Sequence, residues 1–336
     1  MQNKSNYDII VKTLPLYRIL LTLNNIERYR KETTVMNSIE LSFLNKKISE
    51  DAPSFIKGTN EAYYLRLLEI ADDIEKHKNE RPIILLSGPS GSGKTTTAHM
   101  IEKILDEKGC ETHTLSMDNY FKPLTDKEKQ LLSEGKLDLE NPGRVDVDFL
   151  GKQLEAIDNC EEIELPVYDF KDSLRLSGGR FRRNPGELVI LEGIHSLNPD
   201  VITIPDDKTA KIYVSVRTRI ADEDKLLHPS KIRLMRRMIR DSIFRKRSFD
   251  ETMGMFNSVE EGENKYIMPY KYRSNYDVDT FMSYEICAYR NRLFDELSKL
   301  CNEPLVEDIC DFLSDVQAVP ADIIPSDSLI REFIGN

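Results

Sequence analysis

The stretch GPSGSGKTT, residues 88–96, constrains the fold more than any other part of the sequence. It matches the pattern G-x-x-x-x-G-K-[ST] and follows the apolar run PIILLSG, which is typical of a buried strand. After it, apolar residues recur at helical spacing until Gly109, a favourable left-handed stop. A strand, a glycine-rich loop and a helix in this order predict a doubly wound α/β fold with a parallel sheet.

The glycine-rich loop is suited to binding a polyphosphate. Glycines let backbone N–H groups curl around phosphate oxygens, and the start of the following helix favours an anion. We therefore predict a P-loop NTPase-type site, in which Lys94 reaches the β- and γ-phosphates and the Thr95 hydroxyl ligates Mg²⁺. A glycine-rich turn that binds no nucleotide is the alternative. The predicted ATP-binding residues are Gly88, Ser90, Gly91, Ser92, Gly93, Lys94, Thr95 and Thr96.

Three further apolar runs predict strands of the same sheet, at residues 112–118, 187–193 and 211–216. Ligands of open α/β sheets bind at the carboxyl ends of the strands. Asp118 at such an end is a candidate to accept the proton of an attacking hydroxyl, and Glu192 is a candidate magnesium ligand. A turn or capping aspartate and a solvated loop glutamate are the structural alternatives.

A strongly basic segment, KIRLMRRMIRDSIFRKR, spans residues 231–247 and contains a single acidic residue, Asp241. Arginine forks match phosphate oxygens, so a charged helical stripe here predicts a lid that closes over polyphosphate. A solvated helix face and a nucleic-acid-binding helix are the alternatives. The stripe contains Arg233, Arg236, Arg237 and Arg240.

The composition limits the classes of partner that the protein is expected to bind. The net charge of -11, from 58 acidic and 47 basic residues, repels a polyanion, so no nucleic-acid partner is expected. The five cysteines are an odd number without a C-x-x-C pair, which predicts neither a disulfide framework nor a zinc site and favours a reducing compartment. No stretch predicts a membrane span. We expect a cytoplasmic protein without a membrane partner.

The first 80 residues differ from the rest, because they offer mainly helical periodicity. In NEAYYLRLLEIADDIEKHK, the side chains of Tyr64, Leu67, Ile70 and Ile74 fall on one face. We predict a mainly helical N-terminal extension or linker at residues 1–78, a nucleotide-binding domain at residues 79–322 and a C-terminal tail at residues 323–336.

Six motifs, in order, resemble uridine kinases and related nucleoside kinases, within the larger group that includes phosphoribulokinase. The resemblance covers about residues 80 to 295 and rests on GPSGSGKTT, SMDNYF, PVYDF, VILEGIHSLNP, RRMIRDSIFRKRS and PYKY. EGIHSLNP, VEEGENKYIMPY and SLIREFIG are similar to a bacterial branch whose N-terminal extension is related to threonyl-tRNA synthetase accessory domains. We expect this chain to retain only the end of that extension.

The resemblance implies Mg²⁺-dependent transfer of the γ-phosphoryl group of ATP or GTP to the 5′-hydroxyl of a nucleoside, as in pyrimidine salvage. By matching positions, Asp118 is the base, and Thr95 and Glu192 form the magnesium environment. Family members are often oligomeric, so a homo-oligomer is one assembly that the resemblance allows. The implied phosphate-contacting arginines are Arg240 and Arg245, and the implied nucleoside-binding residues are Glu140, Tyr168, Phe170, Arg237 and Arg247.

Four departures from the family limit what the resemblance implies. Glu140 precedes Asn-Pro where the family has an acidic residue before His-Pro, and Ser173 and Met255 stand at or near positions that contact the base. Lys246 replaces the glycine of the usual Arg-Gly-Arg, so lid closure is expected to differ. The base therefore stays open. Two other functions also stay open: a kinase of another hydroxylated metabolite, such as a sugar phosphate, pantothenate-like acid or glycerate, and a regulatory nucleotide-binding module.

Overall fold

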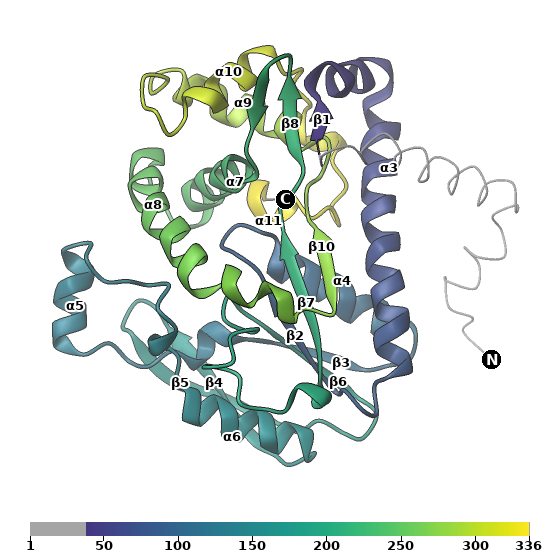
Figure 1. Ribbon diagram of the computed structural model, residues 1–336, viewed down its shortest axis with the longest axis vertical. Helices are drawn as coiled ribbons and strands as arrows, with labels where there is room; N and C mark the ends of the chain where they lie inside the picture. The colour runs from purple at the N-terminus through teal and green to yellow at the C-terminus, as the bar shows by residue number, and fades with distance from the viewer. Residues whose placement is uncertain (1–37, 336) are drawn as a thin grey trace, which may run out of the picture.

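The centre of the fold is a five-stranded parallel sheet (Figure 1). The computed structural model describes residues 38–335. The strands lie in the order β10-β7-β2-β6-β3. They are β2 (Ile83–Ser87), β3 (Thr112–Ser116), β6 (Leu188–Glu192), β7 (Thr209–Ser215) and β10 (Tyr276–Asp279). The first four confirm the strands expected from the sequence, whereas β10 was not predicted.

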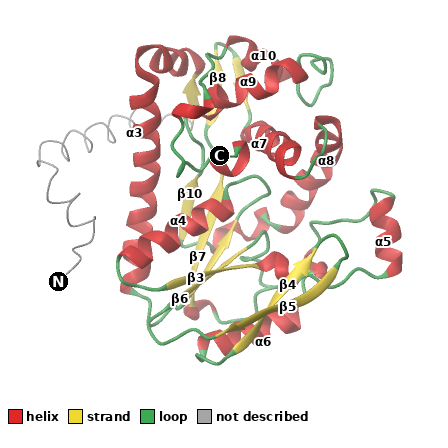
Figure 2. Ribbon diagram, turned by 180° about the vertical axis from the view of Figure 1, so that it is seen from behind, coloured by secondary structure: helices red, strands yellow, loops and turns green. Residues whose placement is uncertain are grey.

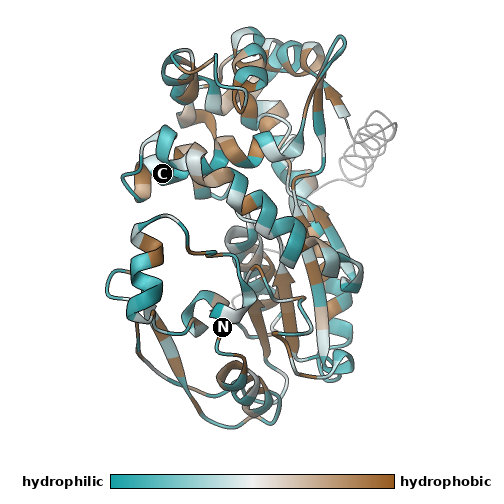
Figure 3. Cartoon of the chain, turned by 60° about the vertical axis from the view of Figure 1, so that its left-hand side comes forward, coloured by the Kyte–Doolittle hydropathy of each residue, from teal (hydrophilic) through white to brown (hydrophobic). Residues whose placement is uncertain are grey.

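Helices cover both faces of the sheet. Ile84 and Leu86 of β2 point into one buried cluster with α3 and α4, while Ile83 and Leu85 point into a second cluster with α6. This alternation confirms the doubly wound α/β prediction. Figure 2 shows α4 crossing one face of the sheet beside α3, and Figure 3 shows the apolar colour concentrated in the strands. The helices are α3 (Leu41–Lys76), α4 (Lys94–Glu107) and α6 (Val147–Asp158).

The C-terminal half forms a helical layer beyond the carboxyl ends of the strands (Figure 1). Helix α7 is its centre and packs against α8, α9 and α11. Because α7 contains most of the basic segment, this layer brings the arginines to the glycine-rich loop. The elements are α7 (Pro229–Phe244), α8 (Phe249–Tyr266), η4 (Met268–Arg273), α9 (Glu285–Leu297), α10 (Glu307–Asp315), η5 (Ala321–Ile323) and α11 (Arg331–Ile334).

Smaller elements surround the main sheet. An antiparallel hairpin, β4-β5, lies near α6, and a three-stranded sheet joins β1 in parallel to β8 and β8 in antiparallel to β9. The bounds are β1 (Ser38–Glu40), η1 (Met117–Tyr120), α5 (Asp126–Ser133), η2 (Pro142–Arg144), β4 (Ile163–Asp169), β5 (Leu174–Phe181), η3 (Asp206–Lys208), β8 (Arg219–Asp222) and β9 (Lys225–Leu227).

The helical periodicity expected in residues 60–78 is confirmed by α3, whose regular backbone is interrupted at Asp51. The buried face includes Tyr63, whereas Tyr64 is only partly buried. The apolar faces of α3 and α11 belong to the same buried cluster. The boundaries after residues 78 and 322 stay predictions, and residues 1–37 of the expected extension lie outside the described residues.

The cysteine expectation requires one correction. Cys301 and Cys310 form a disulfide that joins the segment between α9 and α10 to α10. The two cysteines are nine residues apart in the sequence, and the absence of a C-x-x-C pair did not reveal that the chain turns back between them. The other cysteines, Cys110, Cys160 and Cys287, are free thiols.

Across residues 38–335, no helix is both long enough and apolar enough to span a membrane.

Candidate active site

The glycine-rich loop turns tightly between β2 and α4. A Cβ atom at Gly88 would lie 2.1 Å from a backbone carbonyl oxygen of β7, so a larger residue would displace the sheet. Gly93 immediately precedes α4 and has φ +84°, which favours glycine. The Lys94 ammonium donates to the Pro89 carbonyl at 3.1 Å, across the loop. The loop thus directs the first turn of α4, whose N–H groups have no partner within the helix, toward the carboxyl edge of the sheet.

Three carboxylates gather around Lys94. Asp118 lies in η1 directly after β3, Glu192 ends β6, and Glu140 lies just before η2. Burial raises the pKa of all three carboxyl groups, and the positive charge of Lys94 opposes that rise in each. Asp118 further raises the pKa of the other two by like-charge repulsion. Asp118 is the exposed member of the three, so solvent screens its charge more than that of the buried Glu192.

The two predicted magnesium ligands both offer oxygen atoms. Glu192 is buried and accepts a hydrogen bond from the Ser116 hydroxyl at 3.0 Å, while Thr95 is exposed in the first turn of α4. Oxygen donors on a negatively charged background are the ligands that Mg²⁺ prefers. The residues present therefore fit a magnesium ion, and the unfavourable ionisation of the neighbouring carboxylates is the kind of electrostatic strain that a cation relieves.

A different grouping, Glu111, His113 and Glu187, lies at the amino ends of β3 and β6, away from the loop. The Glu187 carboxylate already accepts hydrogen bonds from the backbone and side chain of Asn184, at 2.8 and 2.6 Å. This grouping has a structural explanation and is separate from the predicted metal ligands.

Asp241 organises the end of the basic segment. Its side chain is fully buried, and Oδ1 accepts hydrogen bonds from Nε and Nη2 of Arg240 at 3.0 and 2.9 Å. Arg245 and Arg247 place their guanidinium groups 3.3 and 3.6 Å from the same carboxylate. Burial lowers the pKa of Arg245, and the negative charge of Asp118 opposes that shift. The two groups therefore interact electrostatically. Asp241 was not predicted as a site residue, although it is the only acid in the segment.

The arginine stripe of α7 faces two different environments. Arg236 is completely buried and pairs with Glu285 through contacts of 2.7 and 3.0 Å. It also donates to the Gly91 carbonyl at 3.1 Å. The prediction of a single stripe facing the phosphates is therefore wrong for Arg236, which faces the interior. Arg237 is also buried and donates to the Ser90 hydroxyl of the glycine-rich loop.

The residues expected to bind a nucleoside come from two places. Tyr168 is buried beside η1, and Phe170 is 63% exposed with its ring edge-on to Tyr168 at 5.0 Å. Glu140 has a buried carboxylate oxygen with no hydrogen-bond partner, which a ligand hydroxyl could satisfy. Its charge interacts with Arg237. Arg247 instead lies with Asp241 at the end of α7.

Thr96 has an unexpected partner near the C-terminus. Its backbone N–H and its hydroxyl donate to Oε2 of Glu332 at 3.2 and 2.7 Å. Glu332 was not predicted as a site residue, because 236 positions separate it from Thr96 and no motif links them.

Residues 83–286, more than half of the chain, match the model of the Phosphoribulokinase / Uridine kinase family. The chain is 34% identical over 199 residues to the uridine kinase of Lactobacillus helveticus, a match that covers 58% of this chain and 84% of that protein. It is 32% identical over 192 residues to the uridine kinase of Staphylococcus haemolyticus, covering 56% and 83%. A possible uridine kinase from Bacillus stearothermophilus aligns at 18% identity with a TM-score of 0.42, covering 64% and 97%.

Proposed function

Because the chain belongs to the phosphoribulokinase/uridine kinase family and is therefore a phosphotransferase, we propose that it transfers the γ-phosphoryl group of ATP or GTP to the 5′-hydroxyl of a nucleoside. The observation that carries this proposal is the gathering of Asp118, Glu140 and Glu192 around Lys94, beside a phosphate-binding loop. If water were the acceptor, the site would need no carboxylate to bind the two hydroxyl groups of a ribose. Glu140 provides such a carboxylate, since one of its oxygen atoms is buried without a hydrogen-bond partner.

The proposed roles follow from charge and position. Lys94 neutralises the transferred phosphoryl group, and Asp118 orients the attacking hydroxyl and accepts its proton. Arg240 and Arg245 stabilise the charge that develops on the phosphoryl oxygens. Asp241 supports this role because it holds both guanidinium groups in one place before any ligand arrives. Phosphoryl transfer depends mainly on positioning and charge neutralisation, so a preassembled pair of arginines favours turnover.

Thr95 and Glu192 would hold Mg²⁺, which would supply charge neutralisation at the β- and γ-phosphates. Glu140 would accept hydrogen bonds from two ribose hydroxyls, since an ionised carboxylate accepts at both oxygens. Tyr168 and Phe170 would border the base, as the exposed Phe170 ring supports.

The finer features of the proposal go further than the family. We place the reaction in pyrimidine salvage in the cytoplasm, with no nucleic-acid or membrane partner and with a homo-oligomer as one allowed assembly. We also assign the chain to the bacterial branch with a threonyl-tRNA-synthetase-like extension, on the strength of SLIREFIG and the other branch motifs in the sequence.

The test is a product-resolved assay with Mg²⁺, ATP or GTP, and in turn uridine, cytidine, adenosine, guanosine, inosine and thymidine. We expect a nucleoside 5′-monophosphate that depends on Asp118, with Asp118→Asn lowering turnover about 10²-fold or more while triphosphate binding persists. Triphosphate binding without any nucleoside monophosphate would reject the proposed acceptor. Near-normal turnover of Asp118→Asn would reject Asp118 as the base.

A further inference from the structure

The first turn of α4 already holds a carboxylate. Helix N-termini bind anions because the first four N–H groups have no partner within the helix and the helix dipole is positive there. The Thr96 N–H is one of these groups, and Glu332 accepts from it at 3.2 Å and from the Thr96 hydroxyl at 2.7 Å. A single carboxylate oxygen, Oε2, thus takes two donors that face the predicted phosphate site.

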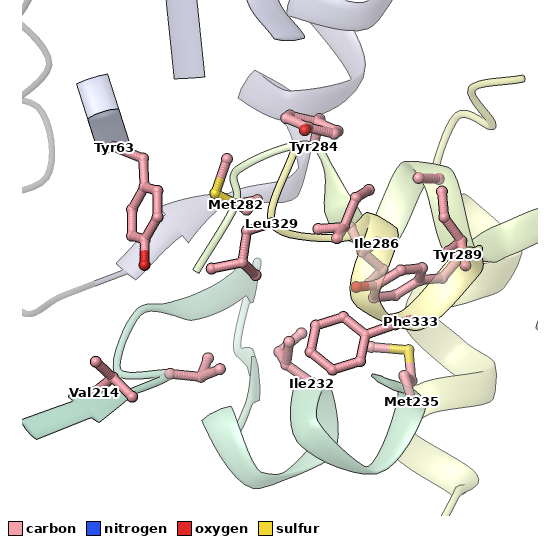
Figure 4. Packing of buried hydrophobic residues seen from close by; sticks show 14 of the residues in the cluster. Tyr63, Val214, Ile232, Met235, Met282, Tyr284, Ile286, Tyr289, Leu329 and Phe333 are labelled. Carbon is pink, nitrogen blue, oxygen red and sulfur yellow. The ribbon is translucent and has the colours of Figure 1, made fainter. Parts of the chain in front are cut away.

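This contact belongs to a docked segment, residues 328–335, and is not an isolated surface pair. Leu329 is fully buried and lies 3.1 Å from the position that a Cβ atom at Gly93 would take. Phe333 is also fully buried, and the Arg236 guanidinium lies 4.9 Å from the centre of its ring. Figure 4 labels Leu329 and Phe333 among the packed side chains of the buried cluster that also contains Ile232 and Met235 of α7. The segment therefore holds Glu332 firmly over the start of α4.

We propose that Glu332 occupies the place of a phosphate group of the bound nucleotide, and that binding requires its carboxylate to withdraw from Thr96. The inference rests on the proposed function only in requiring a nucleoside triphosphate at this loop. Two anions cannot share the same two donors, and Glu332 also adds like-charge repulsion at Glu192. Glu332 is partly exposed, whereas Leu329 and Phe333 are buried, so the side chain rotates outward while α11 stays docked.

The experiment compares nucleotide affinity in the unmodified protein and three variants by calorimetry, with ATP, GTP, ADP and adenosine in the absence of an acceptor nucleoside. In Glu332→Gln the competing charge is removed but the shape is kept, so we expect about tenfold tighter binding of ATP and ADP, equivalent to ~1.4 kcal/mol, and no change for adenosine. Asp327→Asn, an exposed change of the same charge directly before this segment, is the control and leaves all of these affinities unchanged.

Glu332→Ala separates competition from support of the loop. Competition predicts that this variant also binds ATP more tightly than the unmodified protein. The inference is wrong if Glu332→Gln and Glu332→Ala bind ATP no more tightly than the unmodified protein does while they keep its melting temperature. Glu332 would then support the site. If neither the unmodified protein nor the variants bind ATP or GTP, the proposed function itself fails.

Discussion

Asp118, Glu140 and Glu192 are carboxylates whose ionisation the folded protein opposes, since burial raises the pKa of each. A carboxyl group with a pKa above its unfolded value costs no stability at acidic pH, where both states are protonated. The cost begins as the pH rises past the unfolded pKa and is fully present above the folded pKa. At neutral pH, these carboxyl groups therefore lower the stability of the folded protein, and the proposed metal-nucleotide complex would offset that cost.

We expect Asp118→Asn to raise the melting temperature of the ligand-free protein at pH 7 by about 1–3 °C, while it abolishes most turnover. The gain arises mainly because the neutral amide removes a charge that burial disfavours, and also because it removes the repulsion with Glu140 and Glu192. Thermal melts between pH 4 and 8 measure it, and the gain must shrink toward the acidic end. A gain that grows on acidification would contradict the assigned sign.

Glu140 is the residue whose substitution tests the acceptor. We expect Glu140→Gln to weaken nucleoside binding about tenfold and to reduce the preference for ribonucleosides over deoxyribonucleosides, because an amide provides only one accepting oxygen. Steady-state KM and kcat for uridine and deoxyuridine, or for whichever pair is accepted, provide the measurement. Unchanged KM and unchanged preference would exclude Glu140 from the acceptor site.

At the scale of elements, the end of α7 is a preassembled cluster of positive charge. Asp241 joins Arg240, Arg245 and Arg247, and its backbone carbonyl also accepts from the N–H groups of Arg245 and Arg247. Lys246 lies between Arg245 and Arg247 at φ +55°, a left-handed conformation that costs a lysine about 1 kcal/mol. The cluster is therefore fixed by one acid and one strained turn.

We expect Asp241→Asn to lower kcat about tenfold or more, because the three arginines lose the charge that gathers them and repel one another. The KM for the triphosphate should change less, since the arginines act mainly on charge that develops in the transition state. Asp250→Asn is the matched control, an exposed aspartate in the first turn of the neighbouring α8. A loss in both variants would point to helix stability and not to the arginine cluster.

At the scale of the whole molecule, one buried ion pair connects the glycine-rich loop to the C-terminal layer. Arg236 of α7 and Glu285 of α9 are both fully buried, and Arg236 also donates to the Gly91 carbonyl at 3.1 Å. Removing one partner of such a pair leaves an uncompensated charge in the interior. The loop geometry and the global stability are therefore coupled through this pair.

We expect Glu285→Gln to lower the free energy of unfolding by about 3–5 kcal/mol, measured by urea denaturation. Glu296→Gln on the same helix removes an exposed pair with Lys299 and should cost less than about 1 kcal/mol. Equal effects of the two substitutions would show that Arg236 finds another partner.

Local sequence patterns predicted the features of the fold that depend on residues close together in the sequence. The strand, loop and helix around Lys94 follow from spacing alone, and Asp118 and Glu192 were placed at strand ends because parallel strands finish at one edge. Long-range pairs were not predictable in the same way. Glu285 is 49 positions from Arg236, so the helical stripe alone indicated a cleft-facing arginine. The Cys301–Cys310 bridge likewise depends on how the chain turns after α9.

The strained turn after α7 has a practical consequence as a protease site. Arg245, Lys246 and Arg247 are three consecutive basic residues with substantial solvent contact, outside the regular backbone of α7 and α8. Trypsin cleaves after such residues, and cleavage requires the backbone to be released from its surroundings. If the arginines bind phosphate, saturating nucleotide and acceptor should slow cleavage after Arg245, Lys246 and Arg247 several-fold. Digestion followed by mass spectrometry thus reports whether this turn becomes ordered on ligand binding, without labelling the protein.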